Sequence, residues 1–485
     1  MATIDELKKV RHEKLLKFKN LGVDPYPSVA CRDHTVQQAI SLGEREVSVA
    51  GRIVGLRGHG KITFFDLKDE TGTIQIVVKN DQLEETQCAL VALLDLGDFV
   101  SVIGIRGKTV SGEPSVFANA LCVLTKSLRP LPGKWHGIKD VEERYRQRYV
   151  DLLMNENVRQ IFVRRTRIIA SLRRYLDAHG FLEMETPVLQ PIYGGASAKP
   201  FITHHNALDM DLYLRISDEL YLKRLIVSGF EKVYEIGHDF RNEGVDRGHN
   251  PEFTMLEFYW AYADYERLME FTEEMLCSIM KELNGNALTF AYQGQTIDFT
   301  PPWPRRTYRD VLMEFTGIDL DDVDTEEKLR AEIARKKITV DLTGVVGFGE
   351  LLDTLYKKTT RPHLTGPMFL TQRPTAFVSL AKRLPEDPRK TASFQLLVAG
   401  EELINAYNEL NDPLDQAARW RESETLAKKG KTEHEAFDHD YIRALEYGMP
   451  PTAGWGMGID RFVAVLTNQR TIKDVILFPT LRPEE

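Results

Sequence analysis

The chain has 485 residues, which is too many for one hydrophobic core, so two or three domains are expected. Its formal net charge of −9 at pH 7 excludes a globally basic surface, so a polyanionic partner would have to meet local basic patches. The four cysteines are far apart and form no CxxC pair, which argues against a structural zinc site and for a reducing compartment.

Residues 1–43 are predicted to form a helical extension. Residues 4–20 contain six Lys or Arg and three Asp or Glu, with Leu7, Val10 and Phe18 as apolar anchors. Such a helix could contact nucleic-acid phosphates, or it could simply be a solvated helix face. The start, MATIDELKKVRHEK, lacks a signal-peptide core, and no apolar run approaches 18 residues, so a cytoplasmic protein without membrane segments is expected.

Residues 44–126 are rich in β-forming residues. Short strands separated by glycine turns favour a small barrel, which could bind a ligand or be purely structural. The proline-rich stretch LRPLPG then indicates a linker, assigned to residues 127–150, ahead of a second domain at residues 151–485. The five strands are expected at residues 47–54, 61–67, 72–78, 99–106 and 115–124.

The second domain opens with a predicted amphipathic helix. Gly180 is placed to end this helix, and the segment FLEMETP that follows predicts a strand stopped by Pro187. A helix followed by such a strand is common and by itself indicates no function. The apolar residues at helical spacing are Phe162, Ile169, Leu172 and Leu176.

Two strands are predicted around a loop at residues 240–260. The runs at residues 233–236 and 253–260 are the strands, and Gly244 and Gly248 mark the turn. Alternation places Phe253, Met255, Glu257 and Tyr259 on one face, and the other face is a plausible core. A single segment of this kind is more often an antiparallel hairpin with a solvated tip.

The last third of the chain holds two further strands with charged or glycine positions. In residues 402–409, Asn405, Tyr407 and Glu409 share parity; a carboxylate there is costly unless paired, for instance with a substrate ammonium, although an ordinary surface strand is the alternative. In GWGMGIDR, alternating glycines let a ligand approach the backbone, and Arg461 can bind a terminal phosphate. Residues 303–374, which lie between the hairpin and these two strands, are predicted to be mainly helical, with helices at residues 309–315 and 326–337.

Taken in order, these segments resemble motifs 1, 2 and 3 of the class II aminoacyl-tRNA synthetases. The stretches GGASAKPFITHHNALDMDLYLRISDELYLKRL, NELNDPLDQ and ALEYGMPPTAGWGMGIDR extend the resemblance over nearly the whole chain and narrow it to the bacterial-type lysyl-tRNA synthetases. The resemblance implies an α+β multidomain protein, with an N-terminal OB-fold anticodon-binding domain and a catalytic domain on an antiparallel sheet flanked by helices. It further implies a homodimer, with Pro187 as the characteristic residue of its dimer motif.

The same resemblance implies the reaction and its ATP site. Lysine would react with ATP to give lysyl-adenylate, and would then pass to the 3′-terminal adenosine of tRNA(Lys). Arg241 would bind the α-phosphate and Arg461 the γ-phosphate, and these two are the implied catalytic residues. Phe253 would stack on adenine. The remaining implied ATP-binding residues are Glu243, His249, Asn250, Glu402 and Gly458.

The lysine site is implied in the same way. Its selectivity has a physical basis, because an uncharged isostere of lysine would leave buried carboxylates unpaired. Gly195 and Glu219 would bind the α-amino group, and Arg241 and Asn405 the carboxylate side. Tyr407 would pack on the aliphatic stem, and Glu409 and Tyr259, supported by Glu257, would hold the ε-ammonium.

The expected metal site departs from the family pattern. The family usually has a glutamate seven residues before the position of Glu402, and this chain has Gln395 there. An amide oxygen can ligate Mg²⁺ but brings no charge. We expect Mg²⁺ to bind mainly through ATP phosphates, waters and Glu402, with Gln395 as a candidate ligand.

In the barrel, the resemblance implies three anticodon-binding residues. Phe64 would offer a stacking face, Gln75 an amide that reads base edges, and Arg57 a cation. Two alternatives stay open for the chain: an aspartyl- or asparaginyl-tRNA synthetase, and a catalytically silent RNA-binding paralogue. The acidic pocket would repel an acidic substrate, and the retained motif arginines argue against a silent protein.

Overall fold

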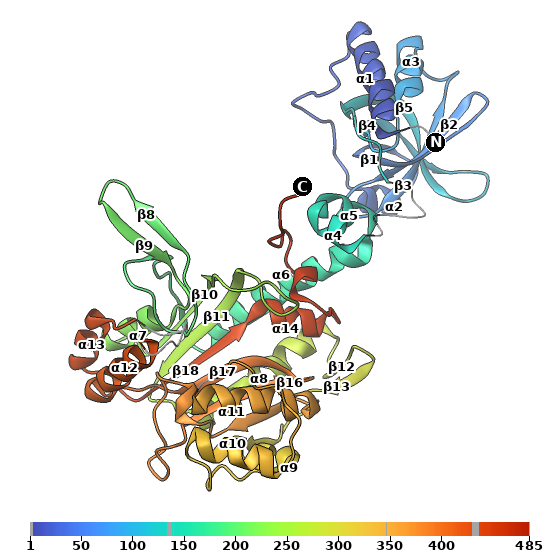
Figure 1. The fold of residues 1–485 in the computed structure, drawn as a ribbon. Coiled ribbons are helices and arrows are strands. Elements are labelled where there is room, and N and C mark those ends of the chain that lie inside the picture. The colour runs from blue at the N-terminus through green and yellow to red at the C-terminus, as the bar shows by residue number, and fades with distance from the viewer. Residues whose placement is uncertain (1–2, 133–137, 139, 346, 429–435, 485) are drawn as a thin grey trace. The chain divides into compact units, whose positions relative to one another are not determined.

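The computed structural model describes residues 3–132, 138, 140–345, 347–428 and 436–484. It divides into two compact units, Met1–Lys139 and Asp140–Glu485, both drawn in Figure 1. The second unit begins inside the stretch 127–150 that the sequence assigns to a linker. The reason is that two short helices, α4 (Val141–Arg146) and α5 (Arg148–Met154), belong to the second unit.

The first unit contains the predicted five-stranded barrel. Its strands close in the order β1-β2-β3-β5-β4. Alternating side chains fill the interior; Phe65, Leu67, Ile74 and Ile76, for example, are buried in the barrel core. The strands are β1 (Glu46–His59), β2 (Ile62–Lys68), β3 (Thr73–Lys79), β4 (Phe99–Lys108) and β5 (Pro114–Thr125).

Helices pack against this barrel. The N-terminal helix α1 is fixed by Phe18, which is buried in the barrel core, and by a hydrogen bond of 2.9 Å from Arg11 Nη2 to the Leu96 carbonyl oxygen. Lys14 Nζ lies 2.7 Å from Asp95 Oδ1. Two of the six basic residues of α1 therefore bind parts of the unit outside the helix itself. The helices are α1 (Ile4–Asn20), α2 (Val36–Ser41) and α3 (Glu85–Leu93).

The second unit is built on one eight-stranded sheet, so the predicted fold class is confirmed. The sheet is antiparallel except for one parallel pair at each end, β6 with β10 and β14 with β15. In spatial order its strands are β14 (Arg305–Thr307), β15 (Met368–Thr371), β16 (Ser393–Val398), β17 (Glu401–Asn408), β18 (Thr452–Gly458), β11 (Glu252–Ala261), β10 (Lys232–Phe240) and β6 (Leu182–Glu183).

Two smaller sheets accompany the large one. The first consists of β7 (Leu189–Gln190), β9 (Met210–Leu214) and β8 (Ile202–His205), and the second of β12 (Thr289–Tyr292) and β13 (Gln295–Asp298). The β8–β9 hairpin projects from the second unit in Figure 1.

Helices cover the two faces of the large sheet unequally. One face packs on α6 (Glu156–Ala178), α8 (Tyr265–Leu283) and α14 (Ile459–Leu466) through the main core, which includes Leu256, Phe258 and Trp455. The opposite face is covered at one end by α7 (Glu219–Val227), α12 (Pro413–Lys428) and α13 (His439–Glu446), which pack with Tyr259 and Tyr407. Within the described ranges, no helix is both long enough and apolar enough to cross a bilayer.

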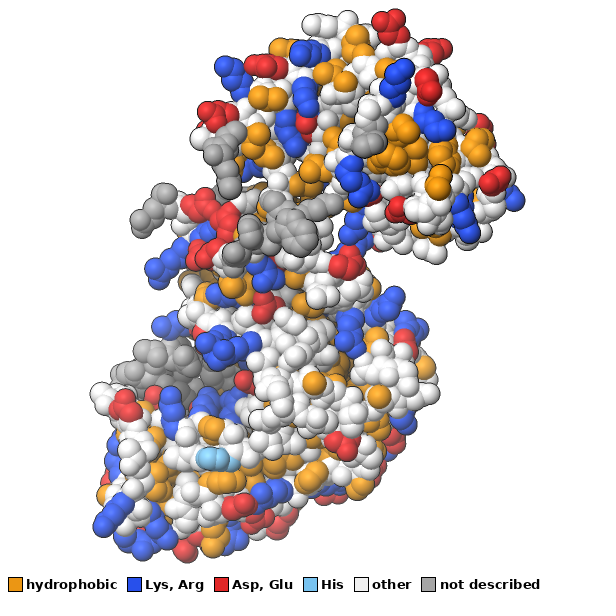
Figure 2. All heavy atoms as spheres, turned by 90° about the vertical axis from the view of Figure 1, so that its right-hand side faces the viewer, with side chains coloured by type: hydrophobic (Ala, Val, Ile, Leu, Met, Phe, Trp, Pro, Cys, Tyr) orange, Lys and Arg blue, Asp and Glu red, His pale blue; other side chains and the backbone are white. Residues whose placement is uncertain are grey.

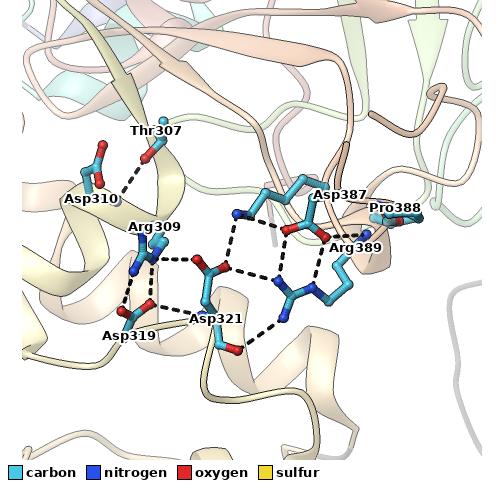
Figure 3. A network of polar contacts seen from close by, with 10 residues as sticks. Thr307, Arg309, Asp310, Asp319, Asp321, Asp387, Pro388 and Arg389 are labelled. Atoms are coloured by element: carbon cyan, nitrogen blue, oxygen red, sulfur yellow. Dashed lines mark hydrogen bonds and ion pairs between the residues drawn. The ribbon is translucent and has the colours of Figure 1, made fainter. Parts of the chain in front are cut away.

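The segment 303–374 carries the helices α9 (Tyr308–Thr316), α10 (Glu326–Arg335) and α11 (Phe348–Thr359) between the edge strand β14 and its neighbour β15. Its core continues onto the sheet through Leu370 and Leu397. Figure 3 shows an ion-pair network that ties this segment to the loop before β16. In it, Asp321 lies 3.0 Å from Arg309 and 3.3 Å from Arg389, and Asp387 lies 2.9 Å from Arg389.

Candidate active site

The glycines of β18 open a floor on the partly covered face of the large sheet. Gly454 lies between Tyr259 on β11 and Tyr407 on β17. A Cβ atom at Gly454 would lie 2.0 Å from Glu409 Oε1 and 2.6 Å from Tyr259 Cε1. Glycine at this position is therefore what allows the carboxylate and the phenol to approach the same point.

The next glycine on this floor separates the other polar side chains. Gly456 lies between Glu257 and Asn405, while Trp455 and Met457, on the other face of β18, are buried in the main core. The side-chain alternation predicted for β11 and β17, the two neighbours of β18, is thus observed. Glu257, Tyr259, Asn405 and Tyr407 line one trough.

Glu257 is a buried carboxyl group in this trough. It accepts hydrogen bonds from the Tyr259 hydroxyl at 3.0 Å and from the Ser217 hydroxyl at 3.1 Å. Burial, together with the nearby charges of Asp239 and Glu219, raises the pKa of Glu257 to about 8. A cation placed in the trough would favour the ionised form of this group.

A second buried carboxylate, Glu219, begins α7. The Tyr407 hydroxyl donates to it at 2.8 Å. Gly195 lies against the same region: a Cβ atom there would meet Ser217 Oγ at 2.8 Å and Glu219 Cβ at 3.2 Å, and its φ of +86° also favours glycine. The structure thus brings Gly195, Glu219 and Tyr407 together, as the sequence predicts.

The third carboxylate, Glu409, is already paired with a cation of this chain. Lys223 Nζ lies 2.5 Å from Glu219 Oε1 and also forms an ion pair with Glu409, and the Lys223 side chain is completely buried. Burial alone would lower the pKa of Lys223, but the two carboxylates outweigh it and hold this pKa well above its usual value. Sequence reasoning missed Lys223, because a Glu and a Lys four residues apart on a helix ordinarily form a surface pair.

A β-bulge brings Glu402 to the same face of the sheet. Leu396 pairs with Ile404, but the next pair is Leu397 with Glu402, so Leu403 is an extra residue in β17. Leu403 and Ile404 are both buried in the main core, and the alternation restarts beyond them. Without the bulge, strict alternation would have placed Glu402 and Asn405 on opposite faces of the sheet.

Arg241 and Phe253 lie together at the end of the β10–β11 pair. The Arg241 guanidinium carbon is 5.1 Å from the centre of the Phe253 ring, and Nη2 donates to the Ile216 carbonyl oxygen at 3.3 Å. The Arg241 amide donates to the Pro251 carbonyl oxygen at 2.8 Å, which closes the neck of the loop. A flat ring and a cation are thus presented side by side.

Arg461 is held at the start of α14. Its Nη1 donates to the Glu402 carbonyl oxygen at 2.7 Å. The preceding Asp460 is buried; it accepts from the Thr254 amide at 2.8 Å and from Arg165 at 2.5 Å. These bonds join α14, β11 and α6, and so fix the direction in which Arg461 leaves the helix.

The loop side chains predicted to position ATP are less constrained. Glu243 and His249 are exposed, and the His249 contact is local, 2.9 Å from Asp246. Asn250 is buried and braces the loop by donating to the Glu252 carbonyl oxygen at 2.6 Å. The structure does not bring Glu243 and His249 onto the glycine floor. Gly458 lies at the end of that floor, and a Cβ atom added there would meet nothing within 4 Å.

Arg215 is a further residue that sequence reasoning missed. It is buried, and its guanidinium lies 3.0 Å from Asp218, 3.3 Å from Asp239 and 2.5 Å from Glu235. Gly237 lies against it, since a Cβ atom there would be 1.9 Å from Arg215 Nη2. The charged residues interrupting the apolar run LYLRISDELYL are the signal that could have found this arrangement.

The predicted metal position has little acidic character. Gln395 is buried and pairs across strands with Asn405, whose Oδ1 accepts from Arg373 Nη1 at 2.9 Å. Burial and the Glu402 carboxylate raise the pKa of Tyr356, while Arg373 acts in the opposite direction. The negative charge of Glu402 and the positive charge of Arg373 therefore both lie near Tyr356. Across the described residues, no group of three His, Cys, Asp or Glu side chains is arranged to hold a metal.

The three residues predicted to read an anticodon meet on the outside of the barrel. Arg57 pairs across strands with Phe64, and its guanidinium lies 2.9 Å from Asp66, which in turn pairs with Gln75. The Gln75 amide donates to Glu113 at 3.0 Å, so it is held in one orientation. On the face drawn in Figure 2, Lys and Arg are interspersed with Asp and Glu, in keeping with local and not global basic character.

The fold and the site define a class of protein, and comparison with known proteins agrees. Residues 140–482 match the family model described as tRNA synthetases class II (D, K and N), and residues 47–124 match the OB-fold nucleic acid binding domain. The chain belongs to the class II tRNA synthetases.

Curated relatives are similar over almost the whole chain. A lysine–tRNA ligase from Dehalococcoides mccartyi is 49% identical over 484 residues, covering 98% of this chain and 97% of the relative. Lysine–tRNA ligases from Carboxydothermus hydrogenoformans and Roseiflexus castenholzii are 47% and 48% identical; each alignment covers 99% of this chain, and 99% and 100% of the respective relative.

Proposed function

We propose that this chain is a lysine–tRNA ligase, which activates L-lysine with ATP to lysyl-adenylate and transfers lysine to the 3′-terminal adenosine of tRNA(Lys). The observation that carries this proposal is the cluster of three buried carboxylates, Glu219, Glu257 and Glu409, around a glycine floor. Buried carboxylates are costly unless they are paired, and an amino acid with two ammonium groups would pair them. The names of the curated relatives support the same substrate.

Within this pocket, the two ends of lysine would be read separately. The ε-ammonium would lie between Glu409 and the Tyr259 hydroxyl, with Glu257 behind the tyrosine. The α-amino group would lie near Gly195 and Glu219. The ring of Tyr407 would pack on the aliphatic stem, and the substrate carboxylate would then point toward Asn405 and Arg241.

The reacting groups would meet at the loop end of the trough. A lysine carboxylate is ionised at neutral pH and needs no general base, so its attack on the α-phosphorus depends on alignment and charge neutralisation. Arg241 would neutralise the α-phosphate and Arg461 the γ-phosphate, and Phe253 would stack on adenine. Glu243, His249 and Asn250 would border the nucleotide, and Gly458 leaves room beside it.

We propose that Mg²⁺ takes part, held mainly by ATP itself. Of the two predicted positions, Glu402 carries a negative charge and Gln395 does not, so the protein contributes one carboxylate. The residues fit an ion that enters with the nucleotide, with Glu402 as the ligand and the Gln395 amide oxygen as a neutral candidate. When bound, Mg²⁺ would neutralise phosphate charge as the pyrophosphate leaves.

We propose that the barrel surface around Phe64 binds the anticodon of tRNA(Lys). Phe64 offers a stacking face beside the Arg57 cation, and Gln75 presents an oriented amide. Phe64→Ala should raise KM for tRNA, while pyrophosphate exchange without tRNA stays unchanged. An equal loss in both assays would argue against this assignment.

We further propose that the protein is a homodimer. Around Pro187, the apolar side chains Leu182, Val188 and Leu189 are exposed, by 51%, 40% and 47% respectively. Clustered exposed apolar residues indicate an interface. We also propose a cytoplasmic location, because all four cysteines are free, as expected in a reducing compartment.

The function is tested by exchange of labelled pyrophosphate into ATP with each of the twenty amino acids in turn. Lysine is expected to support exchange, and the acidic pocket is expected to exclude aspartate and asparagine. Exchange that depends on another amino acid would contradict the substrate, and no exchange with any would contradict the enzymatic activity.

A further inference from the structure

Lys223 is a buried cation inside the proposed lysine pocket. It stands on α7 with its Nζ 2.5 Å from Glu219 Oε1 and in contact with Glu409 Oε2, and none of its side chain is exposed. Besides Glu409, the rings of Tyr407 on β17 and Tyr441 on α13 also face it from other elements, with ring centres 5.9 Å and 6.0 Å from Nζ. Burying an ammonium group completely has a large desolvation cost, so the position of Lys223 requires a compensating physical effect.

The first reason lies in the charge of the pocket. Glu219, Glu257 and Glu409 carry three negative charges when ionised, and Lys223 reduces this to two. Free lysine brings two ammonium groups, and its own carboxylate faces Arg241 in the proposed binding mode. With Lys223 present, the charges of pocket and ligand are equal and opposite; without it, one negative charge would remain buried and unpaired.

The second reason is orientation. Lys223 engages Oε2 of Glu409, and Oε1 of the same carboxylate points to the gap left by Gly454, next to Tyr259. One oxygen is thus anchored inside the protein, while the other faces the glycine floor. A carboxylate held in this way loses less freedom when it binds a ligand ammonium.

We propose that Lys223 is an internal counter-ion that sets the net charge of the pocket and aims Glu409 at the ε-ammonium of the substrate. It is a positioning and specificity residue for the amino acid, and this role rests on the proposed lysine–tRNA ligase function. Lys223 itself takes no part in the chemical steps.

A charge-balanced pair of variants separates this role from simple structural support. Lysine binding to the whole protein is measured by calorimetry for the wild type, Lys223→Met, Glu257→Gln and the double variant. Lys223→Met should weaken lysine binding on the order of a hundredfold, because one buried negative charge stays unpaired. The double variant again has two carboxylates for two ammonium groups, and should bind on the order of tenfold more tightly than Lys223→Met.

The control is Arg443→Met, which removes an exposed cation of α13 that pairs with Asp440 at the surface. It should bind lysine like the wild type. If Lys223→Met does not fold, Lys223→Gln replaces it in the same cycle.

The outcomes are distinguishable. A wild type that binds no lysine would overturn the proposed function. A wild type that binds lysine, with Lys223→Met binding equally well, would overturn the counter-ion role alone. A double variant no tighter than Lys223→Met would also overturn it, since a merely structural lysine is not rescued by removing a carboxylate.

Discussion

The proposed lysine pocket and the proposed ATP loop of the same sheet are built in different ways. The pocket is packed: Lys223 and the carboxylates around it are buried, and Lys223 forms ion pairs with both Glu219 and Glu409. In the proposed ATP loop, Glu243 and His249 are exposed, and His249 pairs with Asp246 of the same loop. One region is preorganised by packed strands and a helix, while the other offers side chains on a loop.

The buried pocket would therefore provide the selectivity for the amino acid, and the exposed loop would provide contacts to the nucleotide. A preorganised polar pocket discriminates strongly, because a wrong ligand leaves buried groups unpaired. Exposed loop side chains contribute less per contact, because water competes for them. Substitutions in the pocket should therefore have large effects on lysine use, and substitutions in the loop should have small effects on ATP use.

The largest effect is expected for Glu409→Gln. It removes the charge proposed to face the ε-ammonium and leaves Lys223 with one carboxylate, so kcat/KM for lysine should fall by about two to three orders of magnitude. ATP binding, measured separately by calorimetry, should survive. Glu270→Gln, a change at an exposed ion pair on α8, is the control. An unchanged kcat and KM for lysine would remove Glu409 from the pocket.

Gly454→Ala should come next. The added methyl group would lie 2.0 Å from Glu409 Oε1 and 2.6 Å from the Tyr259 ring, so both must move away from the glycine floor. The KM for lysine should rise by about tenfold to a hundredfold, with a smaller change in KM for ATP. Gly366→Ala, where a Cβ meets nothing within 4 Å, controls for the substitution itself. Equal losses for both substrates would argue against a local effect.

The pH dependence of lysine binding gives a third, smaller effect. The pKa of Glu257 is raised to about 8, so the unliganded pocket holds a proton at neutral pH. Ammonium groups favour the ionised carboxylate, so lysine binding releases that proton, and affinity should rise by up to about tenfold per pH unit from about pH 6.5 toward pH 8. Glu257→Gln should weaken this dependence, and the remainder would come from Glu409, whose pKa is also raised by burial. A wild-type affinity that is flat over this range would contradict it.

The smallest effects are expected in the loop. Glu243→Ala and His249→Ala should each raise KM for ATP by only about threefold to tenfold, because both side chains are exposed. The KM for lysine should not change. Steady-state exchange kinetics with each substrate varied in turn measure both values, and a loss as large as that of Glu409→Gln would remove the contrast between the two regions.

Local patterns made much of this architecture predictable. The alternation in residues 253–259 places Glu257 and Tyr259 on one face, as observed, because the strand is regular. The position of Glu402 was not predictable by parity, because the extra residue Leu403 shifts the alternation. A bulge depends on the pairing of two strands and on which residues the core accepts, and neither is encoded in one strand alone.

The buried charges were the least predictable part. From the sequence, Lys223 is expected to pair with Glu219 on the surface of a helix. In the folded chain it also pairs with Glu409, which is distant in sequence, and so it links the two carboxylates. Arg215 similarly joins Asp218, just before α7, to Glu235 and Asp239 on β10. Such networks depend on which distant carboxylates the fold brings together, so sequence spacing carries little of the signal.

The central claim is that buried carboxylates select the substrate by its ε-ammonium. It is tested most directly by comparing kcat/KM for L-lysine with that for L-norleucine, its uncharged near-isostere, in pyrophosphate exchange. We expect lysine to be favoured by about four orders of magnitude or more, since norleucine leaves Glu409 without its partner. A preference of only about tenfold, as an apolar pocket would give, would contradict this explanation.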